Sequence, residues 1–313
     1  MSDIDSHEDK PTMTARVTDL QFIAHAVPDL DAERKFYGET WGLTEVAADD
    51  GKIYFAAEGS EHPFVIQLRQ DEEKKTDLIG YSAESRADVD AIYAQAMVAG
   101  CKSIAEPGAA EGPFGGYAAR FFDPDGRALE INCETQKRVA RELSVGEAIP
   151  VGLSHVVLHS PDHKALTKFY EDVLGFKTSD WIGEFMVFLR CNPAHHRLAI
   201  MPGKPSLNHV AFDVRSIDEM MRGLARLTKE GVTLSWGPGR HTAGNNTFTY
   251  YLTPNGNAVE YTSDLEECGE DWVPNTYEMR PDITDQWGTG RIIMGNVPHV
   301  TLDADKGLWC VPA

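Results

Sequence analysis

The sequence has few positively charged residues and lacks a long hydrophobic run. Its 313 residues include 29 Lys and Arg against 49 Asp and Glu, which gives a formal net charge of −20 at pH 7. A surface field of this sign repels phosphate backbones and anionic membranes. The longest apolar stretches fall well short of the roughly 20 residues that a membrane-spanning helix needs. We therefore expect no nucleic-acid partner and no membrane insertion.

Cysteine is also scarce, and its spacing excludes two kinds of small scaffold. The five cysteines include no Cys-x-x-Cys pair; they are Cys101, Cys133, Cys191, Cys268 and Cys310. Such a scattered, odd-numbered set fits incidental thiols in a reducing compartment better than a disulfide framework or a zinc knuckle. The opening residues, MSDIDSHEDKPTMTAR, lack the basic start and apolar core of a secretion signal. We expect a cytoplasmic protein.

What the sequence does contain is an internal repeat. The segment HAVPDLDAERKFYGETWGL from His25 resembles HSPDHKALTKFYEDVLGF from His159. LIGYSAESRADVDAIYAQAMVAGCKSI from Leu78 resembles LNHVAFDVRSIDEMMRGLARLTKEGVTL from Leu207, and RFFDPDGRALEINC resembles YYLTPNGNAVEYTS. The first two pairs each indicate a helix that ends at a glycine, and the third indicates two strands joined by a DPDG or TPNG turn. Four βαβββ-like units are predicted, beginning near residues 18, 76, 151 and 205.

The repeat predicts an α+β fold with two tandem domains, each made of two βαβββ modules. The expected divisions are a disordered lead-in (1–17), a first domain (18–135), a linker (136–147), a second domain (148–264) and a C-terminal extension (265–313). The extension is acidic, rich in Trp and Pro and without clear periodicity. We expect it to pack over the second domain, where Arg280, Trp287 or Arg291 would form a lid over the active site.

Three polar residues distinguish the second half from the first. They are His155, His209 and Glu260, and alignment of the repeats places them opposite Phe22, Gly80 and Glu130. Either histidine alone would more often be a buried core residue, and Glu130 shows that the carboxylate alone proves nothing. Equivalent strands of two units can, however, point side chains into one cleft. Two imidazoles and one carboxylate then form the facial triad that is typical of non-haem Fe(II).

Two further polar clusters lie in the same half. In RCNPAHHRLAIM, His195 and His196 are adjacent at the start of an apolar strand, so only one of them can face a cleft. In GPGRHTAGNNTFTYYL, Arg240 and His241 lie in a turn before the strand that begins near Tyr250. The alternatives are a solvated loop pair and an ordinary polar hairpin. Imidazoles and a phenol beside an open metal site would suit proton transfer from a diol.

With these residues in view, positions 18–264 resemble the type I extradiol ring-cleaving dioxygenases of the vicinal oxygen chelate superfamily. The most specific part is the hairpin GPGRHTAGNNTFTYYLTPNGNAVEY, which holds that family's His, Tyr and Glu in order and spacing. The resemblance implies the vicinal oxygen chelate fold, a metal-free N-terminal domain, and Fe(II) or Mn(II) bound by His155, His209 and Glu260. It also implies catalytic roles for His196, rather than His195, and for His241 and Tyr250. The substrate contacts expected on this basis are Phe188, His195, Arg240 and Asn245.

The implied reaction is the dioxygen-dependent opening of a catecholic ring next to its two hydroxyls, in the catabolism of aromatic compounds. The partners would be the small diol and dioxygen, and family members are commonly homo-oligomers. Two alternatives stay open. One is another metal-dependent enzyme of the superfamily, an isomerase or lyase, because one fold supports several chemistries. The other is a binding protein that holds an aromatic molecule without turnover.

Overall fold

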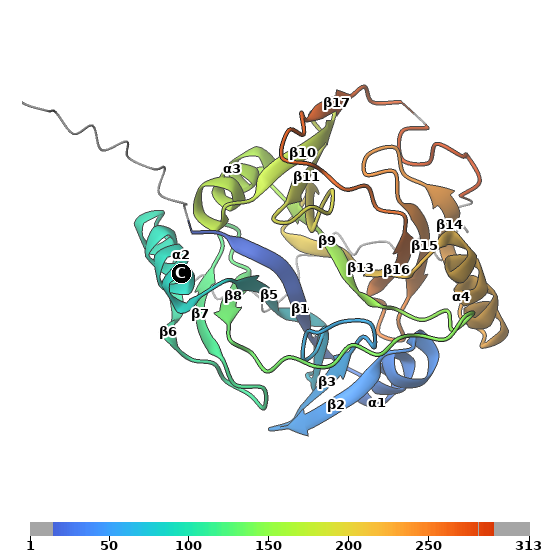
Figure 1. Ribbon diagram of the computed structural model, residues 1–313, viewed down its shortest axis with the longest axis horizontal. Helices are drawn as coiled ribbons and strands as arrows, with labels where there is room; N and C mark the ends of the chain where they lie inside the picture. Colours follow the sequence, from blue (N-terminus) through green and yellow to red (C-terminus); the bar gives the residue numbers. More distant parts are fainter. Residues whose placement is uncertain (1–14, 281, 291–313) are drawn as a thin grey trace, which may run out of the picture.

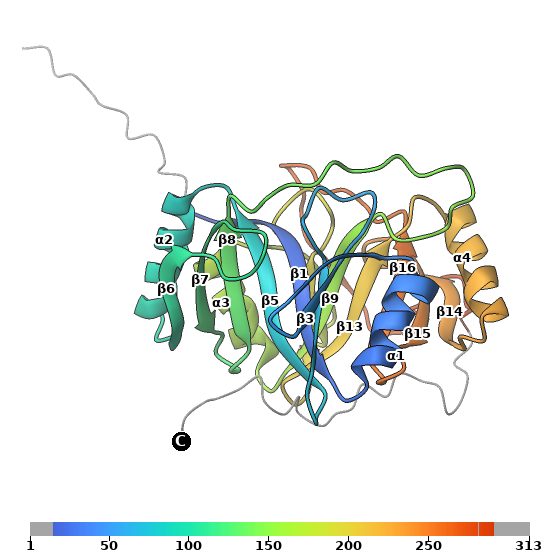
Figure 2. The ribbon, with the colours of Figure 1, turned by 90° about the horizontal axis from the view of Figure 1, so that it is seen from below.

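The protein is described by a computed structural model that covers residues 15–280 and 282–290. Within these residues the strands form two mixed β-sheets, one of eight and one of nine strands (Figure 1). The two sheets lie next to each other, with β1 beside β9 in both views (Figure 2). None of the helices in the described part of the chain has the length and hydrophobicity of a transmembrane segment.

The first sheet comes from the first half of the chain. Its strands are β1 (Val17–Val27), β2 (Thr44–Asp49), β3 (Lys52–Ala56), β4 (Ile66–Gln70), β5 (Lys75–Ala83), β6 (Ser103–Ala109), β7 (Tyr117–Phe122) and β8 (Ala128–Cys133). Their spatial order is β2-β3-β4-β1-β5-β8-β7-β6. The helices are α1 (Leu30–Lys35), which continues as the π-helix η1 (Phe36–Trp41), and α2 (Arg86–Val98).

The second sheet repeats this arrangement. Its strands are β9 (Gly152–Ser160), β10 (Lys177–Ile182), β11 (Met186–Arg190), β12 (Leu198–Pro202), β13 (Ser206–Asp213), β14 (Leu234–Arg240), β15 (Thr247–Leu252) and β16 (Ala258–Ser263), with helices α3 (His163–Leu174) and α4 (Ile217–Lys229). The order is β14-β15-β16-β13-β9-β12-β11-β10-β17. The ninth strand, β17 (Asn275–Tyr277), belongs to the C-terminal extension.

The four predicted βαβββ units are confirmed and begin at β1, β5, β9 and β13. Each unit's helix begins at an Asp or Ser whose side chain accepts a hydrogen bond from a backbone N–H of the first turn; these caps are Asp29, Ser85, Asp162 and Ser216. Local sequence signals therefore define where each unit's helix starts.

Large aromatic side chains join the two halves into one core. Trp41 of η1 packs on Tyr261 of the second sheet, with ring centroids 4.0 Å apart. Tyr170 of α3 and Phe176 pack in turn against Tyr81 of the first sheet, at 6.4 and 5.5 Å. The first helical segment of each half thus covers the sheet of the other half, so the orientation of the two sheets is set by buried contacts.

The strand register corrects one pairing of the repeats. Gly80 of β5 lies between Phe22 of β1 and Glu130 of β8. Ala211 of β13 occupies the matching place in the second sheet, between β9 and β16. Gly80 therefore corresponds to Ala211, and the expectation that it corresponds to His209 is wrong.

Leu78 is the actual counterpart of His209. Leu78 lies two residues before Gly80, as His209 lies two residues before Ala211. The capping residues Ser85 and Ser216 agree with this offset and need no gap between strand and helix. The sequence comparison was misled by an identical leucine near the start of each segment, which shifted the alignment by two residues.

The segment that connects β8 to β9 forms hydrogen bonds with both halves of the molecule. Its backbone is held by Arg141 N–H donating to the Glu58 carbonyl at 2.7 Å and by the Arg215 guanidinium donating to the Leu143 carbonyl at 2.6 Å. The predicted lead-in lies largely in residues 1–14, outside the described residues, and β1 already begins at Val17. The exact domain and linker boundaries stay predictions.

Candidate metal centre

His155, His209 and Glu260 come together on three neighbouring strands, β9, β13 and β16. His155 and Glu260 flank Ala211 in the strand register, and His209 lies two residues before Ala211 on the same face of β13. Because the residue between them is a small alanine, the longer side chains can converge above it. One ligand atom from each of the three residues lies within 4.8 Å of the others.

The two imidazoles present their Nε2 atoms to one carboxylate oxygen. Glu260 Oε2 lies 3.3 Å from His155 Nε2 and 3.1 Å from His209 Nε2. On the far side of each ring, His209 Nδ1–H donates to Asn208 Oδ1 at 2.7 Å, and His155 Nδ1 lies 3.2 Å from Ser154 Oγ. These outer contacts fix the ring orientations and leave the Nε2 lone pair of His209 directed at Glu260.

The polar atoms at the centre fit a divalent metal ion. His209 Nε2 and both carboxylate oxygens of Glu260 are buried without a well-aligned hydrogen-bond partner. Leaving such atoms unpartnered is costly, and Glu260 is completely buried. A cation coordinated by two imidazole nitrogens and one carboxylate would satisfy them, and this ligand set suits Fe(II) or Mn(II).

Burial and mutual contact also set the charge states. Burial alone would raise the pKa of Glu260, but the close approach of the His155 and His209 imidazoles outweighs it and holds that pKa well below its usual range. Burial lowers the pKa of His209 despite the neighbouring carboxylate. An ionised Glu260 and a neutral His209 are the forms that bind metal.

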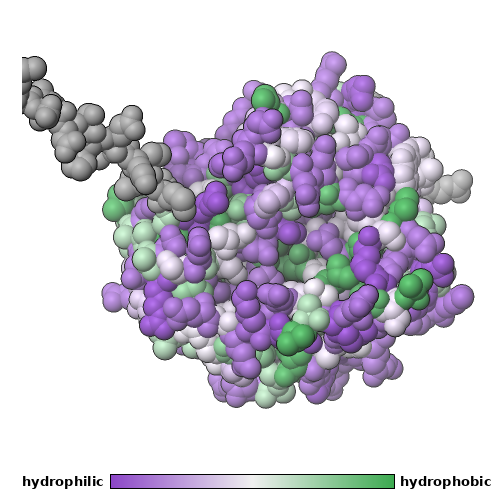
Figure 3. Space-filling model, viewed as in Figure 1, coloured by the Kyte–Doolittle hydropathy of each residue, from purple (hydrophilic) through white to green (hydrophobic). Residues whose placement is uncertain are grey.

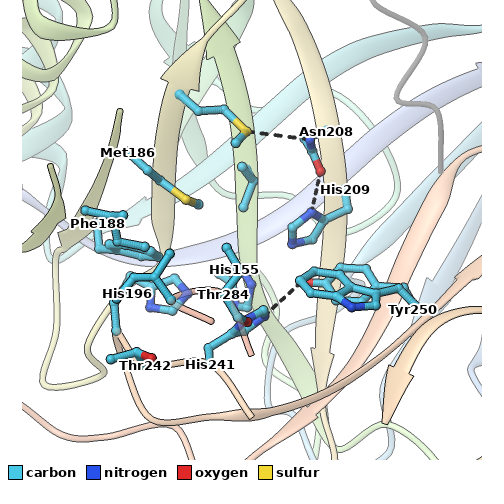
Figure 4. Close-up of a pocket in the computed structure, with 16 residues that line it drawn as sticks. His155, Met186, Phe188, His196, Asn208, His209, His241, Thr242, Tyr250 and Thr284 are labelled. Atoms are coloured by element: carbon cyan, nitrogen blue, oxygen red, sulfur yellow. Dashed lines mark hydrogen bonds between the residues drawn. The ribbon is translucent and has the colours of Figure 1, made fainter. Parts of the chain in front are cut away.

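A cavity of about 300 Å³ opens beside the two histidines (Figure 4). Its walls are mainly apolar and include Val157, Ile182, Met186, Phe188, Met201, Trp236, Ala243 and Ile283. The polar groups among its described lining residues are four imidazoles, one phenol, two threonines and one asparagine. The outer face in Figure 3 is in contrast largely hydrophilic, with hydrophobic residues in small groups.

His196 lines this cavity next to the candidate ligands. Its ring centroid lies 4.3 Å from that of His155 and 5.0 Å from that of Phe188. Burial, together with the neighbouring histidines, lowers the pKa of His196 well below its ordinary value. The side chain is therefore neutral at neutral pH and is available as a proton acceptor.

His241 and Tyr250 form a second proton-handling pair. His241 Nδ1–H donates to the Thr284 carbonyl at 2.6 Å, so its Nε2 accepts from the Tyr250 hydroxyl at 3.1 Å. Burial and the neighbouring Glu260 raise the pKa of Tyr250 well above its usual value, which keeps the phenol protonated. Trp236 stacks on Tyr250 with centroids 5.1 Å apart and restrains its ring.

His195 was expected to contact the substrate, but the structure places it outside the cavity lining. His195 is completely buried, does not line the cavity and directs its ring away from it, toward Asp180. The two residues lie in the loop before β12, and their imidazoles contact each other with the Nδ1 atoms 3.0 Å apart, so His196 lines the cavity and His195 lies behind it. Of the four expected substrate contacts, Phe188 lines the cavity.

Arg240 and Asn245 also lie outside the cavity lining. The Arg240 guanidinium donates to Asp264 at 2.7 Å and to the Asn245 carbonyl, and it lies over the Trp287 ring at 5.0 Å. Asn245 has a positive φ of 52° and accepts from Gln286 Nε2 through its side-chain oxygen at 3.1 Å. Both residues hold the hairpin and the extension together, which explains why neither reaches the cavity.

The C-terminal extension contributes to the site through its backbone path. Ile283 and Thr284 line the cavity, and Gln286 donates to the carbonyl of His241 at 2.7 Å. Arg280 is instead exposed and lies 3.4 Å from Asp282. Arg291, expected as part of a lid, lies outside the described residues.

Sequence reasoning missed several residues around the site. Asp180, Asn208, Trp236 and Thr284 hold the imidazoles or the phenol in place. Asn208 could have been found, because it is a polar residue directly before a candidate ligand. No local pattern marks Thr284, whose carbonyl oxygen accepts from His241.

Comparison with known proteins agrees with this architecture. Residues 20–131 and 152–261 both match the sequence model of the Glyoxalase/Bleomycin resistance protein/Dioxygenase superfamily. Metapyrocatechase 2 of Cupriavidus necator is 27% identical over 297 residues, which cover 87% of this chain and 89% of that protein. Biphenyl-2,3-diol 1,2-dioxygenase of Paraburkholderia xenovorans is 29% identical over 291 residues, covering 87% of this chain and 95% of that protein.

A solved structure is more similar still. The Mn(II)-bound glyoxalase from Novosphingobium aromaticivorans is 48% identical, with a TM-score of 0.91, and the match covers 94% of this chain and 97% of that one. Since the family match spans both halves, the chain belongs to the Glyoxalase/Bleomycin resistance protein/Dioxygenase superfamily.

Proposed function

We propose that this member of the superfamily is an extradiol dioxygenase, which uses dioxygen and one divalent metal ion to open a catecholic ring next to its two hydroxyls. The observation that carries the proposal is the convergence of His155, His209 and Glu260 beside a largely apolar cavity that also holds two separate proton-handling groups. The similarity to two ring-cleaving dioxygenases over most of the chain supports it.

His155, His209 and Glu260 would hold the metal, which we take to be Fe(II), with Mn(II) as the alternative. The three side chains approach from one side, because they project from one face of a single sheet. When bound, the metal would supply open coordination positions for the two diol oxygens and for dioxygen. The donor set by itself discriminates poorly between these two ions.

His241 and Tyr250 would position one hydroxyl of the diol. His241 Nε2 is an acceptor because Nδ1–H is already bound to the Thr284 carbonyl. Tyr250 stays protonated and is a donor. A hydroxyl that enters between them can donate to the imidazole and accept from the phenol, which orients the ring and assists its deprotonation.

His196 would handle a proton at the other side of the site. Figure 4 shows His196 and Tyr250 to either side of His155. A neutral imidazole at this place can accept a proton and return it later in the reaction, as general acid–base catalysis requires. The apolar walls around Phe188 and Met186 keep water from competing for these hydrogen bonds.

Oxygen consumption tests the proposal. The full chain, loaded anaerobically with Fe(II) or with Mn(II), is mixed with a panel of catechols and dihydroxypyridines while dissolved oxygen is recorded. We expect uptake of one dioxygen per diol and a ring-opened product in the mass spectrum. The apolar lining of the described cavity favours uncharged rings with apolar substituents over carboxylated ones. Absence of uptake with every diol and both metals would contradict the proposal.

A glyoxalase-type isomerase is the second candidate, because the 48% identical structure carries that description. Such an enzyme needs no dioxygen, so the two candidates separate in an anaerobic assay. Anaerobic conversion of the hemithioacetal of methylglyoxal and glutathione, without oxygen uptake on any diol, would establish the isomerase instead. Under the dioxygenase proposal this conversion does not occur.

A further inference from the structure

A buried chain of three polar side chains leads from the cavity into the protein behind His196. His196 Nδ1 lies 3.0 Å from His195 Nδ1, and His195 Nε2 lies 2.9 Å from Asp180 Oδ2. His195 and Asp180 are fully buried and His196 is 2% exposed. We propose that Asp180 and His195 are positioning residues, which place the ring proton of His196 on Nδ1 and leave its Nε2 as an acceptor toward the cavity.

The hydrogen bonds of Asp180 set the direction of the chain. Its Oδ1 accepts from the backbone N–H of Asn275 at 2.7 Å and from that residue's side-chain Nδ2 at 3.3 Å. An ionised carboxylate only accepts, so the contact at Oδ2 requires a proton on His195 Nε2. In this proposal His195 carries a single ring proton, the one on Nε2, so its Nδ1 is an acceptor. The proton between the two histidines then belongs to His196 Nδ1.

The C-terminal extension holds this chain in place. Strand β17 pairs with β10, and Asn275 is the register partner of Asp180. Trp272 Nε1–H donates to the Ser179 carbonyl at 2.8 Å, and the His195 backbone N–H donates to the Glu266 carbonyl at 2.8 Å. The extension thus contributes to the site on this side through the orientation of Asp180.

The arrangement gives His196 a defined role at the cavity. With Nδ1–H committed to His195, the free lone pair on Nε2 can accept a proton from a bound hydroxyl. The O–H bond breaks, an Nε2–H bond forms, and the positive charge on His196 is stabilised through His195 by the carboxylate of Asp180. The tautomer does not depend on the reaction, whereas this consequence for turnover rests on the proposed function.

Asp180→Asn should reverse the direction of the hydrogen bonds that run from residue 180 through His195 to His196. The backbone N–H of Asn275 binds the side-chain oxygen at position 180, so the new amide nitrogen must face His195 Nε2 and donate to it. His195 then carries its proton on Nδ1, and the proton of His196 moves to Nε2, where it blocks acceptance from substrate. We expect kcat to fall by about 100-fold with KM and bound metal unchanged.

Nitrogen NMR of the imidazoles tests the proposal directly. The full chain is labelled with 15N-histidine and loaded with Zn(II), a diamagnetic divalent ion, and spectra of His195→Gln and His196→Gln assign the signals. We expect His196 protonated on Nδ1 and His195 on Nε2 in the wild type, and both reversed in Asp180→Asn. Asp123→Asn, the same change at a buried carboxylate of the first half, should alter neither the tautomers nor kcat.

Two outcomes would overturn the proposal. One is a wild-type His196 that carries its proton on Nε2, and this result needs no variant to fold. The other is a folded Asp180→Asn protein with unchanged tautomers. If the wild type consumes no oxygen, the proposed function fails, while the spectra still decide the tautomer.

Discussion

The two halves of the molecule share one scaffold but fill the equivalent place in each sheet with different chemistry. In the second half, His155, His209 and Glu260 converge on one point. In the first half, the positions of the two histidines hold Phe22 and Leu78, which belong to one hydrophobic cluster. A phenyl ring and an isobutyl group thus occupy the space that two imidazoles hold in the other sheet.

The carboxylate is present in both halves, but its partner differs. Glu130 accepts from Arg120 Nε at 2.7 Å and from Asn132 Nδ2 at 3.1 Å. Arg120 is its register partner on β7, and the matching position on β15 is Tyr250, opposite Glu260. A guanidinium neutralises the first carboxylate, whereas a phenol cannot neutralise the second. The comparison teaches that Glu260, unlike Glu130, has no guanidinium or ammonium partner among the described side chains, which fits the proposed metal ion.

The largest expected effect comes from breaking the set of ligands. In His155→Ala the remaining pair, His209 and Glu260, offers too few donors to retain the metal, and we expect bound metal and turnover both to be lost. Metal content per chain, measured by mass spectrometry after desalting, checks this. His25→Ala removes a buried imidazole from the first half and should keep its metal. Normal metal content in His155→Ala would show that the ligand assignment is wrong.

The next effect separates metal binding from proton transfer. His196→Ala removes a cavity imidazole that is not a candidate ligand, so bound metal should stay at the wild-type level. We expect kcat to fall about 100- to 1,000-fold, in the range of general acid–base catalysis. Steady-state oxygen uptake together with metal analysis checks both parts. Loss of metal in this variant would move His196 into the ligand set.

A smaller effect on turnover is expected from changing Tyr250, which occupies the position that Arg120 has in the first half. Tyr250→Phe keeps the stacked ring beside Trp236 but deletes the hydroxyl that bonds to His241. Loss of one hydrogen bond to a substrate oxygen that becomes charged costs about 1.5–3 kcal/mol, so we expect kcat to decrease about 10- to 100-fold. Unchanged turnover in Tyr250→Phe would exclude the phenol from proton transfer.

The smallest expected effect concerns the packing of Phe22 against Gly80 in the first half. Gly80→Ala introduces the residue found at the matching Ala211, but its Cβ would lie 2.1 Å from the Phe22 ring. We expect a loss of about 1–3 kcal/mol in unfolding free energy, measured by urea denaturation. Phe22→Leu in the same chain should recover part of that loss. Gly152→Ala, where an added methyl meets nothing within 4 Å, is the matched control.

Much of the fold was predictable because the repeat is carried by strong local signals. The Pro-Asp turns, the related DPDG and TPNG turns, the capping residues and the strand periodicity all recur, and the four units follow from them. The candidate ligands could be found for the same reason, since a repeat exposes the positions at which one half departs from the other. Gly80 and Leu78 show the limit, because strand register is decided by pairing with β1 and β8 rather than by similarity of letters.

The places of His195, Arg240 and Asn245 could not be predicted, because they are set by contacts between segments that are distant in the sequence. Adjacency of His195 and His196 indicated that one imidazole faces the cavity, but the burial of the other follows from Asp180, fifteen residues earlier. Arg240 and Asn245 were expected at the substrate because their hairpin resembles that of the extradiol dioxygenases. The extension engages both through Trp287 and Gln286, and it has no periodicity from which that docking could be predicted.

Anomalous X-ray diffraction from crystals of the full chain grown with Mn(II) tests the difference between the halves most directly. We expect one strong peak per chain, within bonding distance of His155 Nε2, His209 Nε2 and the Glu260 carboxylate, and none beside Glu130. A map with no peak at the three second-half residues, or with an equal peak in the first half, would contradict the assignment.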